Sequence, residues 1–278
     1  VLLEELLSRA PSDPLIKNKL AHSHLRLGDW DKARRYFTQA ALHLESGLIP
    51  IYSGLAELEG AEQHFEDARD WGRRSLQLND IRAKAEAERY RQPHLSTTNG
   101  QNKIISFSLY GAAPKYSEGL LLTLKTAAQY YPEFKCRIYT DGRVPQGVMA
   151  RIEAAGAEIV FISKHMAGWH PTMWRFAALS DPEAHTVLIR DVDSPILERE
   201  TILVGIWANS GNAVHIIRDW YAHTPLILAG LFGLQGKRLD GLDPSIEAYL
   251  ERSNHHWGVD QDYLRDVIWP VVADQALI

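Results

Sequence analysis

Apolar residues in the first third of the chain recur every three to four positions, and the pattern appears twice. Leu20-Ala21 matches Leu55-Ala56, and Trp30-Asp31-Lys32-Ala33 matches Phe65-Glu66-Asp67-Ala68, so the two copies are 35 residues apart. Apolar positions at this spacing predict amphipathic helices. Because the turn signal Leu27-Gly28-Asp29 interrupts the first copy, we expect two helices in each repeat.

These repeats set the expected domain organisation. Residues 1–92 are predicted to form an α-helical solenoid, with repeats at 14–47 and 49–82 and a solvent-exposed capping helix at 80–92. Residues 93–102 lack periodicity and are rich in turn formers, which predicts a linker. The remaining residues, 103–278, are numerous enough for a second domain with its own core.

From residue 103 onward, short apolar runs alternate with segments of helical spacing. Alternation of strands and helices requires right-handed crossovers and gives a mostly parallel sheet with helices on both faces. The predicted fold is therefore a helical solenoid followed by an α/β/α domain. The expected strands are 104–110, 135–141, 158–162, 187–189 and 213–219, and the expected helices are 117–131, 146–155, 173–179, 198–208 and 244–252.

The strand at 187–189 runs directly into two carboxylates, Asp191 and Asp193, before Pro195 stops it. Side chains two residues apart on an extended chain point to the same side, and open α/β sheets bind ligands at the carboxyl ends of their strands. Carboxylate oxygens suit Mg²⁺ or Mn²⁺, which keep open positions for substrate phosphates. A metal site and a solvated strand end both fit this pattern, because Asp-x-Asp occurs in two further places.

Those two other copies lie in different contexts. Asp29 follows a turn and is typical of a helix N-cap, which accounts for the copy formed with Asp31. Asp260-Gln261-Asp262 opens the last predicted helix, where Asp260 is either a cap or a functional carboxylate. The apolar run at 228–233 is interrupted by Gly230, which indicates a backbone that passes close to another group.

Composition narrows the function classes. A net charge of -5 argues against broad nucleic-acid binding, which needs a basic face. The single cysteine, Cys136, excludes an internal disulfide framework and a multi-cysteine zinc site. No apolar run approaches the roughly 18 residues needed to span a bilayer. We expect a cytoplasmic protein, although the chain does not begin with Met and residue 1 need not be the natural start.

Together these features resemble a bacterial GT-A-type glycosyltransferase, an enzyme that uses a nucleotide-sugar donor. The resemblance covers roughly residues 103–272 and rests on the strand–helix order, Arg190-Asp191-Val192-Asp193-Ser194, the run at 228–233 and Asp260-Gln261-Asp262. It implies that Asp191 and Asp193 hold Mn²⁺ or Mg²⁺ against the diphosphate of a UDP- or GDP-sugar. The last of these segments resembles the Asp-Gln-Asp of family-8 retaining enzymes, which implies that it lies beside the transferred sugar.

Further site residues follow from the same resemblance. Family-8 enzymes have a metal-binding His after the Asp-Gln-Asp helix, and this chain has none there, so a third ligand must come from His223, His255 or His256; we name His223. Asp219 or Asp260 is the candidate general base if the reaction inverts configuration, and Trp169 and Trp257 are candidates for stacking on sugar rings. The implied catalytic residues are Asp260, Gln261 and Asp219, and the implied donor-binding residues are Phe107, Leu109, Tyr110, Asp141, Arg175, Arg190 and Gly230.

Several of these residues have a plainer alternative. Arg190 should point to the face opposite Asp191, and Asp141 followed by Gly142 is equally typical of a simple turn. The repeats resemble the tetratricopeptide repeat, whose period is about 34 residues. They would either dock a protein partner or a second copy, or serve as a scaffold.

Three functions remain open from the sequence. The first is a metal-dependent glycosyltransferase that acts on an unknown protein, glycan or lipid-linked acceptor. The second is a non-catalytic interaction protein in which the second domain is a degenerate scaffold. The third is a nucleotidyltransferase, which would carry a Gly-rich, basic signature after its first strand; Tyr110-Gly111-Ala112-Ala113-Pro114-Lys115 matches that poorly.

Overall fold

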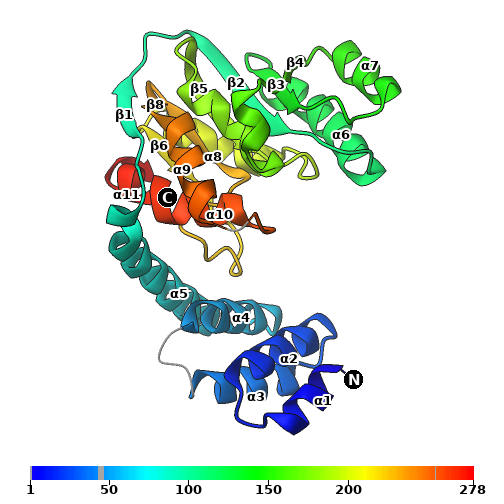
Figure 1. Ribbon diagram of the computed structural model, residues 1–278, viewed down its shortest axis with the longest axis vertical. Helices are drawn as coiled ribbons and strands as arrows, with labels where there is room; N and C mark the ends of the chain where they lie inside the picture. Colours follow the sequence, from blue (N-terminus) through cyan, green and yellow to red (C-terminus); the bar gives the residue numbers. More distant parts are fainter. Residues whose placement is uncertain (1, 43–46, 254) are drawn as a thin grey trace. The chain divides into compact units, whose positions relative to one another are not determined.

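The computed structural model describes residues 2–42, 47–253 and 255–278 (Figure 1). It divides into two compact units. The helical unit comprises residues 1–82 together with 218–226, and the sheet unit comprises 83–217 together with 227–278. N-terminal helical hairpins followed by a mixed, mostly parallel α/β domain confirm the predicted fold class. No helix among the described residues is long and apolar enough to cross a membrane.

Two helical hairpins follow the predicted repeat. The first pairs α2 (Pro14–Arg26) with α3 (Trp30–Ala41), and the second pairs α4 (Leu48–Ala61) with α5 (Phe65–Glu86), while α1 (Leu2–Arg9) precedes both. Asp29 is the N-cap of α3, as predicted, because its carboxylate accepts a hydrogen bond from the Lys32 amide at 3.4 Å. Residues 43–46 of the first repeat lie outside the described part of the chain.

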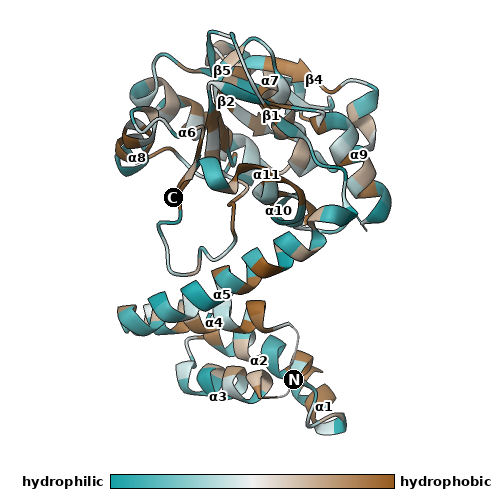
Figure 2. Cartoon of the chain, turned by 90° about the vertical axis from the view of Figure 1, so that its left-hand side faces the viewer, coloured by the Kyte–Doolittle hydropathy of each residue, from teal (hydrophilic) through white to brown (hydrophobic). Residues whose placement is uncertain are grey.

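The separate capping helix at 80–92 was a wrong prediction. Helix α5 continues without a break to Glu86, and a single 3₁₀ turn, η1 (Ala87–Arg89), follows it. The Ala-, Glu- and Arg-rich sequence contains no glycine or proline between 73 and 92, so nothing in it stops a helix. Figure 2 shows α5 as largely hydrophilic along its length.

The segment 218–226 packs within the helical unit. The Thr224 hydroxyl is hydrogen-bonded to Ser53 of α4, and its carbonyl accepts a bond from Asn79 of α5 at 3.4 Å. Gly60 leaves the space that the Tyr221 ring fills, since an added Cβ would lie 2.3 Å from that ring. The predicted strand at 213–219 is therefore shorter than expected, because only Val214–Ile216 (β6) pairs in the sheet.

The sheet unit is built on seven strands in the order β4-β3-β2-β5-β7-β6-β9. All neighbouring pairs are parallel except the two made by β7, which confirms the mostly parallel sheet. Figure 2 shows hydrophobic segments gathered in its central strands. The strands are β2 (Asn102–Ser108), β3 (Lys135–Thr140), β4 (Glu158–Phe161), β5 (Ala184–Arg190), β6, β7 (Leu231–Gln235) and β9 (Ala276–Leu277).

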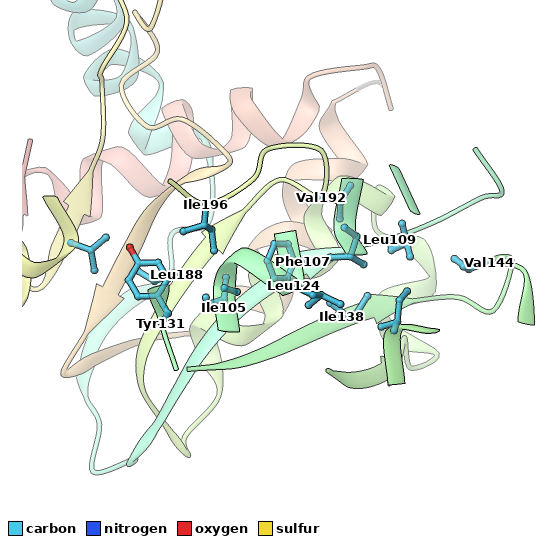
Figure 3. Close-up of a cluster of buried hydrophobic side chains, with 14 of the residues drawn as sticks. Ile105, Phe107, Leu109, Leu124, Tyr131, Ile138, Val144, Leu188, Val192 and Ile196 are labelled. Atoms are coloured by element: carbon cyan, nitrogen blue, oxygen red, sulfur yellow. The ribbon is translucent and has the colours of Figure 1, made fainter. Parts of the chain in front are cut away.

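The two faces of this sheet are covered differently. On one face, apolar side chains such as Ile105, Phe107 and Leu188 pack against three helices, α6 (Pro114–Tyr130), α7 (Gln146–Ala154) and α8 (Glu198–Ala208), as Figure 3 shows in part. The other face meets a long 3₁₀ segment, η3 (Pro171–Ser180), where an α-helix was expected. The remaining helical elements are η2 (His165–Gly168), α9 (Leu242–Arg252), α10 (Val259–Tyr263), the π-helical turn η4 (Leu264–Ile268), α11 (Trp269–Val272) and η5 (Ala273–Gln275).

The strand order creates a switch point between β2 and β5. The chain steps from β2 outward to β3 and β4, then returns to place β5 on the other side of β2. Connections that leave in opposite directions open a crevice at the carboxyl ends of the two strands. Tyr110 follows β2 and Asp191 follows β5, so both lie at this crevice.

The stretch predicted as a linker contains a short strand, β1 (His94–Thr97), which pairs antiparallel with β8 (Lys237–Asp240). Beyond it, the Thr98 hydroxyl donates to the Ala184 carbonyl at 3.1 Å. Four residues are too few for a period-2 pattern to be recognised in a sequence. The division between compact units falls after Arg82, and the domain limits at 92 and 103 stay a prediction.

Candidate functional site

Arg175 lies at the centre of a charged cluster at the switch point. Its side chain comes from η3 and is buried, with 5% of the residue exposed. One guanidinium nitrogen, Nη1, donates to the Asp191 carboxylate and to the Arg190 carbonyl at 3.2 Å, while Nη2 donates to Asp260 Oδ2 at 3.1 Å. Two carboxylates that are far apart in the sequence are therefore joined by one buried cation.

Strand β2 fixes the position of Arg175. Ser106 and Ser108 alternate with the core residues of β2 and so point to the face that η3 covers. The Ser106 hydroxyl donates to the Arg175 carbonyl at 2.7 Å, and the Arg175 amide donates to the Ser108 hydroxyl at 2.9 Å. Burial by itself would lower the pKa of the Arg175 guanidinium, but Asp191 and Asp260 outweigh burial and raise that pKa. Arg175 therefore stays charged.

Gly230 is the point where the backbone approaches this cluster. It precedes β7, whose Leu231 pairs with Arg190, so Gly230 lies opposite Asp191. A Cβ added at Gly230 would lie 2.0 Å from Asp191 Oδ2. The close approach expected for the run at 228–233 thus involves the first carboxylate of Asp191-Val192-Asp193, and only glycine leaves room for it.

Asp193 faces a different cation. Its Oδ2 atom lies 2.9 Å from Nζ of Lys115, which is in the first turn of α6 and largely exposed. Side chains at Asp191 and Asp193 keep 47% and 32% of their surface exposed. Mg²⁺ and Mn²⁺ are commonly held by one or two carboxylates together with water and substrate phosphates. The extended chain expected at 191–193 is a turn in the structure, in which the Ser194 amide donates to the Asp191 carbonyl at 3.4 Å. Both carboxylates are partly open to solvent and are ligands of the kind that these ions take, and the exposed Lys115 contact is one that an ion could displace.

Gln261 ties α10 to the segment that leads into β7. Its side-chain nitrogen donates to the Ile227 carbonyl, and its side-chain oxygen accepts from the Ala229 amide at 3.1 Å. Both ends of the amide are thereby used by backbone groups. The contacts of Gln261 make it a residue that positions the turn around Gly230.

The residues predicted to hold the nucleotide lie in three kinds of environment. Phe107 and Leu109 are buried in the core between the sheet and α6. Tyr110 is partly exposed, and burial raises the pKa of its phenol, on which the charges of Arg175, Asp260 and Asp191 also act. Asp141 accepts from the Arg143 amide at 3.1 Å, the geometry of a simple turn.

Arg190 lies on the opposite face from Asp191, as the alternation along β5 indicates. It is 1% exposed, and its Nε donates to Glu200 Oε1 of α8 at 2.7 Å. Its Nη1 donates to the carbonyls of Ile189 at 2.7 Å and Phe232 at 2.9 Å. These contacts hold Arg190 inside the core, and we leave it out of the donor site proposed below.

Asp219 and His223 belong to the helical unit, where Asp219 Oδ1 lies 2.9 Å from His223 Nδ1. Among the described residues, the three acidic or imidazole groups close enough to share one ion are Glu59, Glu62 and His64. Arg34 already contacts both of those carboxylates. This group was not predicted, although Glu59 and Glu62 lie three residues apart at the C-terminal end of α4.

Two further residues were overlooked or misjudged. Trp169 is buried, so its indole is no exposed surface for a sugar ring. Lys115 was considered only as part of a poor nucleotidyltransferase signature, yet it contacts Asp193. The signal that could have revealed it is the short connection from β2 to α6, which carries its basic residue to the same sheet edge as Asp193.

No protein-family model matches the chain. An uncharacterized protein of Neisseria meningitidis serogroup B is 29% identical over 150 residues, which cover 49% of this chain and 28% of that protein's own length. Among solved structures, the galactosyltransferase LgtC in complex with donor and acceptor sugar analogues aligns with a TM-score of 0.38 at 15% identity, over 62% of this chain and 72% of LgtC.

A mutant O-GlcNAc transferase of Thermobaculum terrenum aligns with a TM-score of 0.28 at 12% identity, over 58% of this chain and 36% of the transferase. At TM-scores below 0.5 these two likenesses say nothing about what this chain does. Its function has to be argued from its own site.

Proposed function

We propose that the chain is a metal-dependent glycosyltransferase of the GT-A type, which moves a sugar from a nucleotide-sugar donor to an acceptor. The observation that carries this proposal is the buried bridge from Asp191 through Arg175 to Asp260 at the switch point of the sheet. It joins the strand-end Asp-x-Asp to the late acidic segment, two of the motifs on which the sequence resemblance rests.

In this proposal Asp191 and Asp193 hold Mn²⁺ or Mg²⁺. The ion would neutralise the diphosphate that leaves with the nucleotide. Asp191 Oδ1 is directed by Arg175 while Oδ2 faces Gly230, so the carboxylate has a fixed orientation before any ligand arrives. A group fixed in advance costs little reorganisation when charge develops beside it.

Asp260 is proposed to lie beside the transferred sugar. Its side chain is 10% exposed and bound to Arg175, so it presents one fixed edge to the crevice. A carboxylate next to an oxocarbenium-like centre stabilises the positive charge that forms when the glycosidic bond breaks. Gln261 serves this arrangement by holding the turn at 227–229 against α10.

The helical hairpins are proposed to be tetratricopeptide repeats that dock a protein partner, an acceptor or a second copy of the chain. Their helix pairs recur at the spacing of that repeat, with α2 and α4 beginning at Pro14 and Leu48. Several large apolar side chains on these helices or at their C-caps are exposed, among them Leu15, Leu27, Leu42 and Phe65. Light scattering of the chain at increasing concentration would detect self-association.

The test of the enzymatic proposal is binding of sugar nucleotides. Thermal shifts with a panel of UDP- and GDP-sugars, with and without Mn²⁺, identify a donor, and calorimetry then gives its affinity. Asp193→Asn should weaken Mn²⁺-dependent binding at least ~100-fold, or ~2.7 kcal/mol. Asp31→Asn is the matched control, because it alters another Asp-x-Asp copy on the surface of α3.

Two outcomes would contradict the proposal. If Asp193→Asn bound the donor with unchanged Mn²⁺ dependence, the metal would lie elsewhere. If the wild-type chain bound no sugar nucleotide, the alternative of a non-catalytic interaction protein would replace it.

A further inference from the structure

Trp257 stands out among the aromatic residues of the sheet unit. It is 94% exposed, more than any other large apolar side chain in the described part of the chain. It lies in the loop just ahead of α10, between exposed His256 and Gly258, whose φ of 91° is left-handed. Trp169, the other candidate from the sequence, is buried.

The exposure of Trp257 does not come from a loosely attached loop. His256 Nε2 lies 3.0 Å from Asp262 Oδ2, and the Val259 amide donates to the His256 carbonyl at 3.2 Å. Asp262 is held in turn by Nη1 of Arg265 at 2.6 Å.

Arg265 also contacts the buried carboxylate of Asp266, with its Nε donating to Oδ1 at 2.6 Å. A chain of charged contacts thus runs from the protein interior to the residue next to Trp257. These contacts fix the backbone beside Trp257 while its indole remains exposed to solvent.

This exposed indole lies close to the proposed reaction centre. Trp257 precedes Asp260 by three residues, so at about 3.8 Å per step their Cα atoms are at most about 11 Å apart. On the same loop, the ring of His255 lies 6.4 Å from the ring of His170. Burial lowers the pKa of His170, and the charge of Asp260 opposes that shift, so His170 lies within the electrostatic influence of Asp260. A single bound molecule could touch both the indole and the edge of the Asp260 cluster.

We propose that Trp257 is the stacking surface for a sugar ring of the acceptor, so that the acceptor is a glycan. This inference rests on the proposed glycosyltransferase function and names the substrate class of the same site. An indole face carries a negative quadrupole and a large apolar area, which suits the C–H face of a pyranose. The exposed imidazole of His255, two residues before Trp257, can bond its hydroxyl groups.

The surroundings of Trp257 disfavour the two other common partners of an exposed tryptophan. Membrane-surface segments combine several apolar residues with Lys or Arg, whereas residues 255–258 read His-His-Trp-Gly. Protein hot spots lie inside a larger ring of contacts that exclude water, whereas Trp257 follows two exposed polar side chains, His255 and His256, and precedes a glycine. A lone, rigid aromatic face among polar groups is the arrangement that sugar recognition uses.

The experiment follows the indole N–H signals of the full chain by NMR while lactose, maltose or N,N′-diacetylchitobiose is added. Trp257→Phe assigns the signal of Trp257, and Trp257→Ala removes the stacking surface. Trp220→Ala is the matched control, since Trp220 is also exposed, at 52%, but its ring rests on Tyr221 at 4.0 Å in the helical unit. Donor affinity in the presence of Mn²⁺ is measured for each variant.

We expect at least one disaccharide to shift the Trp257 signal. Trp257→Ala should weaken that binding at least 10-fold and leave donor affinity within twofold, while Trp220→Ala changes neither. Binding of all three sugars unaltered by Trp257→Ala, or no shift with any of them, overturns the inference. Loss of the proposed function is recognised separately, because it appears as absent donor binding in the wild type.

Discussion

Two arginine–carboxylate clusters involve consecutive residues at the end of β5, Arg190 and Asp191, and they differ in how far their carboxylates are exposed. Arg190 at the end of β5 turns into the core and contacts Glu200 and two carbonyls. Asp191, the next residue, turns to the other face and contacts Arg175. Both arginines are buried, but Asp191 keeps nearly half of its side chain in solvent.

The difference lies in what each carboxylate can still do. Glu200, in the first turn of α8, keeps only 12% of its side chain exposed, so its pair with Arg190 acts on stability. Asp191 lies beyond the last strand pairing, at the crevice, where a ligand can reach it. Taking a carboxylate out of water costs free energy, and Asp191, which keeps 47% of its side chain exposed, has lost less of its hydration than Glu200.

The largest effect is expected from breaking the closed cluster. Arg190→Met leaves Glu200 without its cation inside the protein, which should lower the free energy of unfolding by about 3–5 kcal/mol. Denaturant unfolding of the full chain measures this, and the double variant Arg190→Met/Glu200→Gln should recover part of the loss. Donor affinity of the folded protein should be retained. If Arg190→Met folded but no longer bound donor, the Arg190–Glu200 pair would also be needed for donor binding, and the proposed difference from the Arg175 cluster would be wrong.

The open cluster is expected to respond in turnover. Asp260→Asn keeps the size of the side chain and removes the charge that faces Arg175. If Asp260 acts on the transition state, release of nucleoside diphosphate from the donor should slow about 100-fold, or ~2.7 kcal/mol, at nearly constant donor affinity. The N-cap of α10 is Gly258, so Asp260 is not the helix cap that its sequence position also allowed. Were Asp260 only a structural partner of the buried Arg175, Asp260→Asn would lower the free energy of unfolding and leave turnover unchanged.

A smaller effect is expected at the backbone that faces Asp191. Gly230→Ala would place a methyl group 2.0 Å from Asp191 Oδ2, which should cost about 1–3 kcal/mol through overpacking. Because Asp191 must turn away, Mn²⁺-dependent donor binding should weaken together with stability. Gly147→Ala in α7 is the control, since nothing lies within 4 Å of a Cβ there. Equal behaviour of the two variants in calorimetry would show that Asp191 is not confined.

The smallest effect concerns pH and the closed cluster. His215 is buried on β6, its ring 4.6 Å from that of Trp207, and burial followed by the charge of Arg190 lowers its pKa well below 6.5. The folded state therefore binds fewer protons than the unfolded state below that pH. Stability from His215 is complete above about pH 6.5 and falls as the pH drops toward the folded pKa, by up to ~1.4 kcal/mol per pH unit.

The check on His215 is a comparison of unfolding free energies between pH 7 and pH 5. The difference between wild type and His215→Gln should shrink as the pH falls, because only the wild type carries the penalty. A difference that stays constant over this range would mean that His215 titrates normally.

The sequence predicted the strands of the sheet, but it did not predict the contacts of Arg175 with Asp191 and Asp260 at the ends of those strands. The apolar run from Val187 to Ile189 predicts a buried strand from neighbouring residues alone. Asp29 likewise predicts a helix cap, because its side chain bonds to an amide only three residues away. The role of Arg175 could not be read in this way. It depends on Ser106 and Ser108 of a distant strand, which no local pattern connects to η3.

Family resemblance linked Asp191 to Asp260, but it did not supply the cation between them. The short strands β1 and β8 were missed because each gains its stability from the other, 140 residues away along the chain at Thr97 and Lys237. The same holds for Thr224, whose contacts with Ser53 and Asn79 come from tertiary packing.

The segment 218–226 belongs to the helical unit, although the residues before and after it in the sequence belong to the sheet unit. The chain passes from one unit to the other three times, after residues 82, 217 and 226. If α4 and α5 were exchanged for another hairpin, the new hairpin would need a glycine at position 60 to leave room for the Tyr221 ring. It would also need the Asn79 side-chain amide, which donates to the Thr224 carbonyl. Gene fusion and repeat shuffling move a unit as one continuous stretch of sequence. A single break in this sequence does not separate the helical unit from the sheet unit.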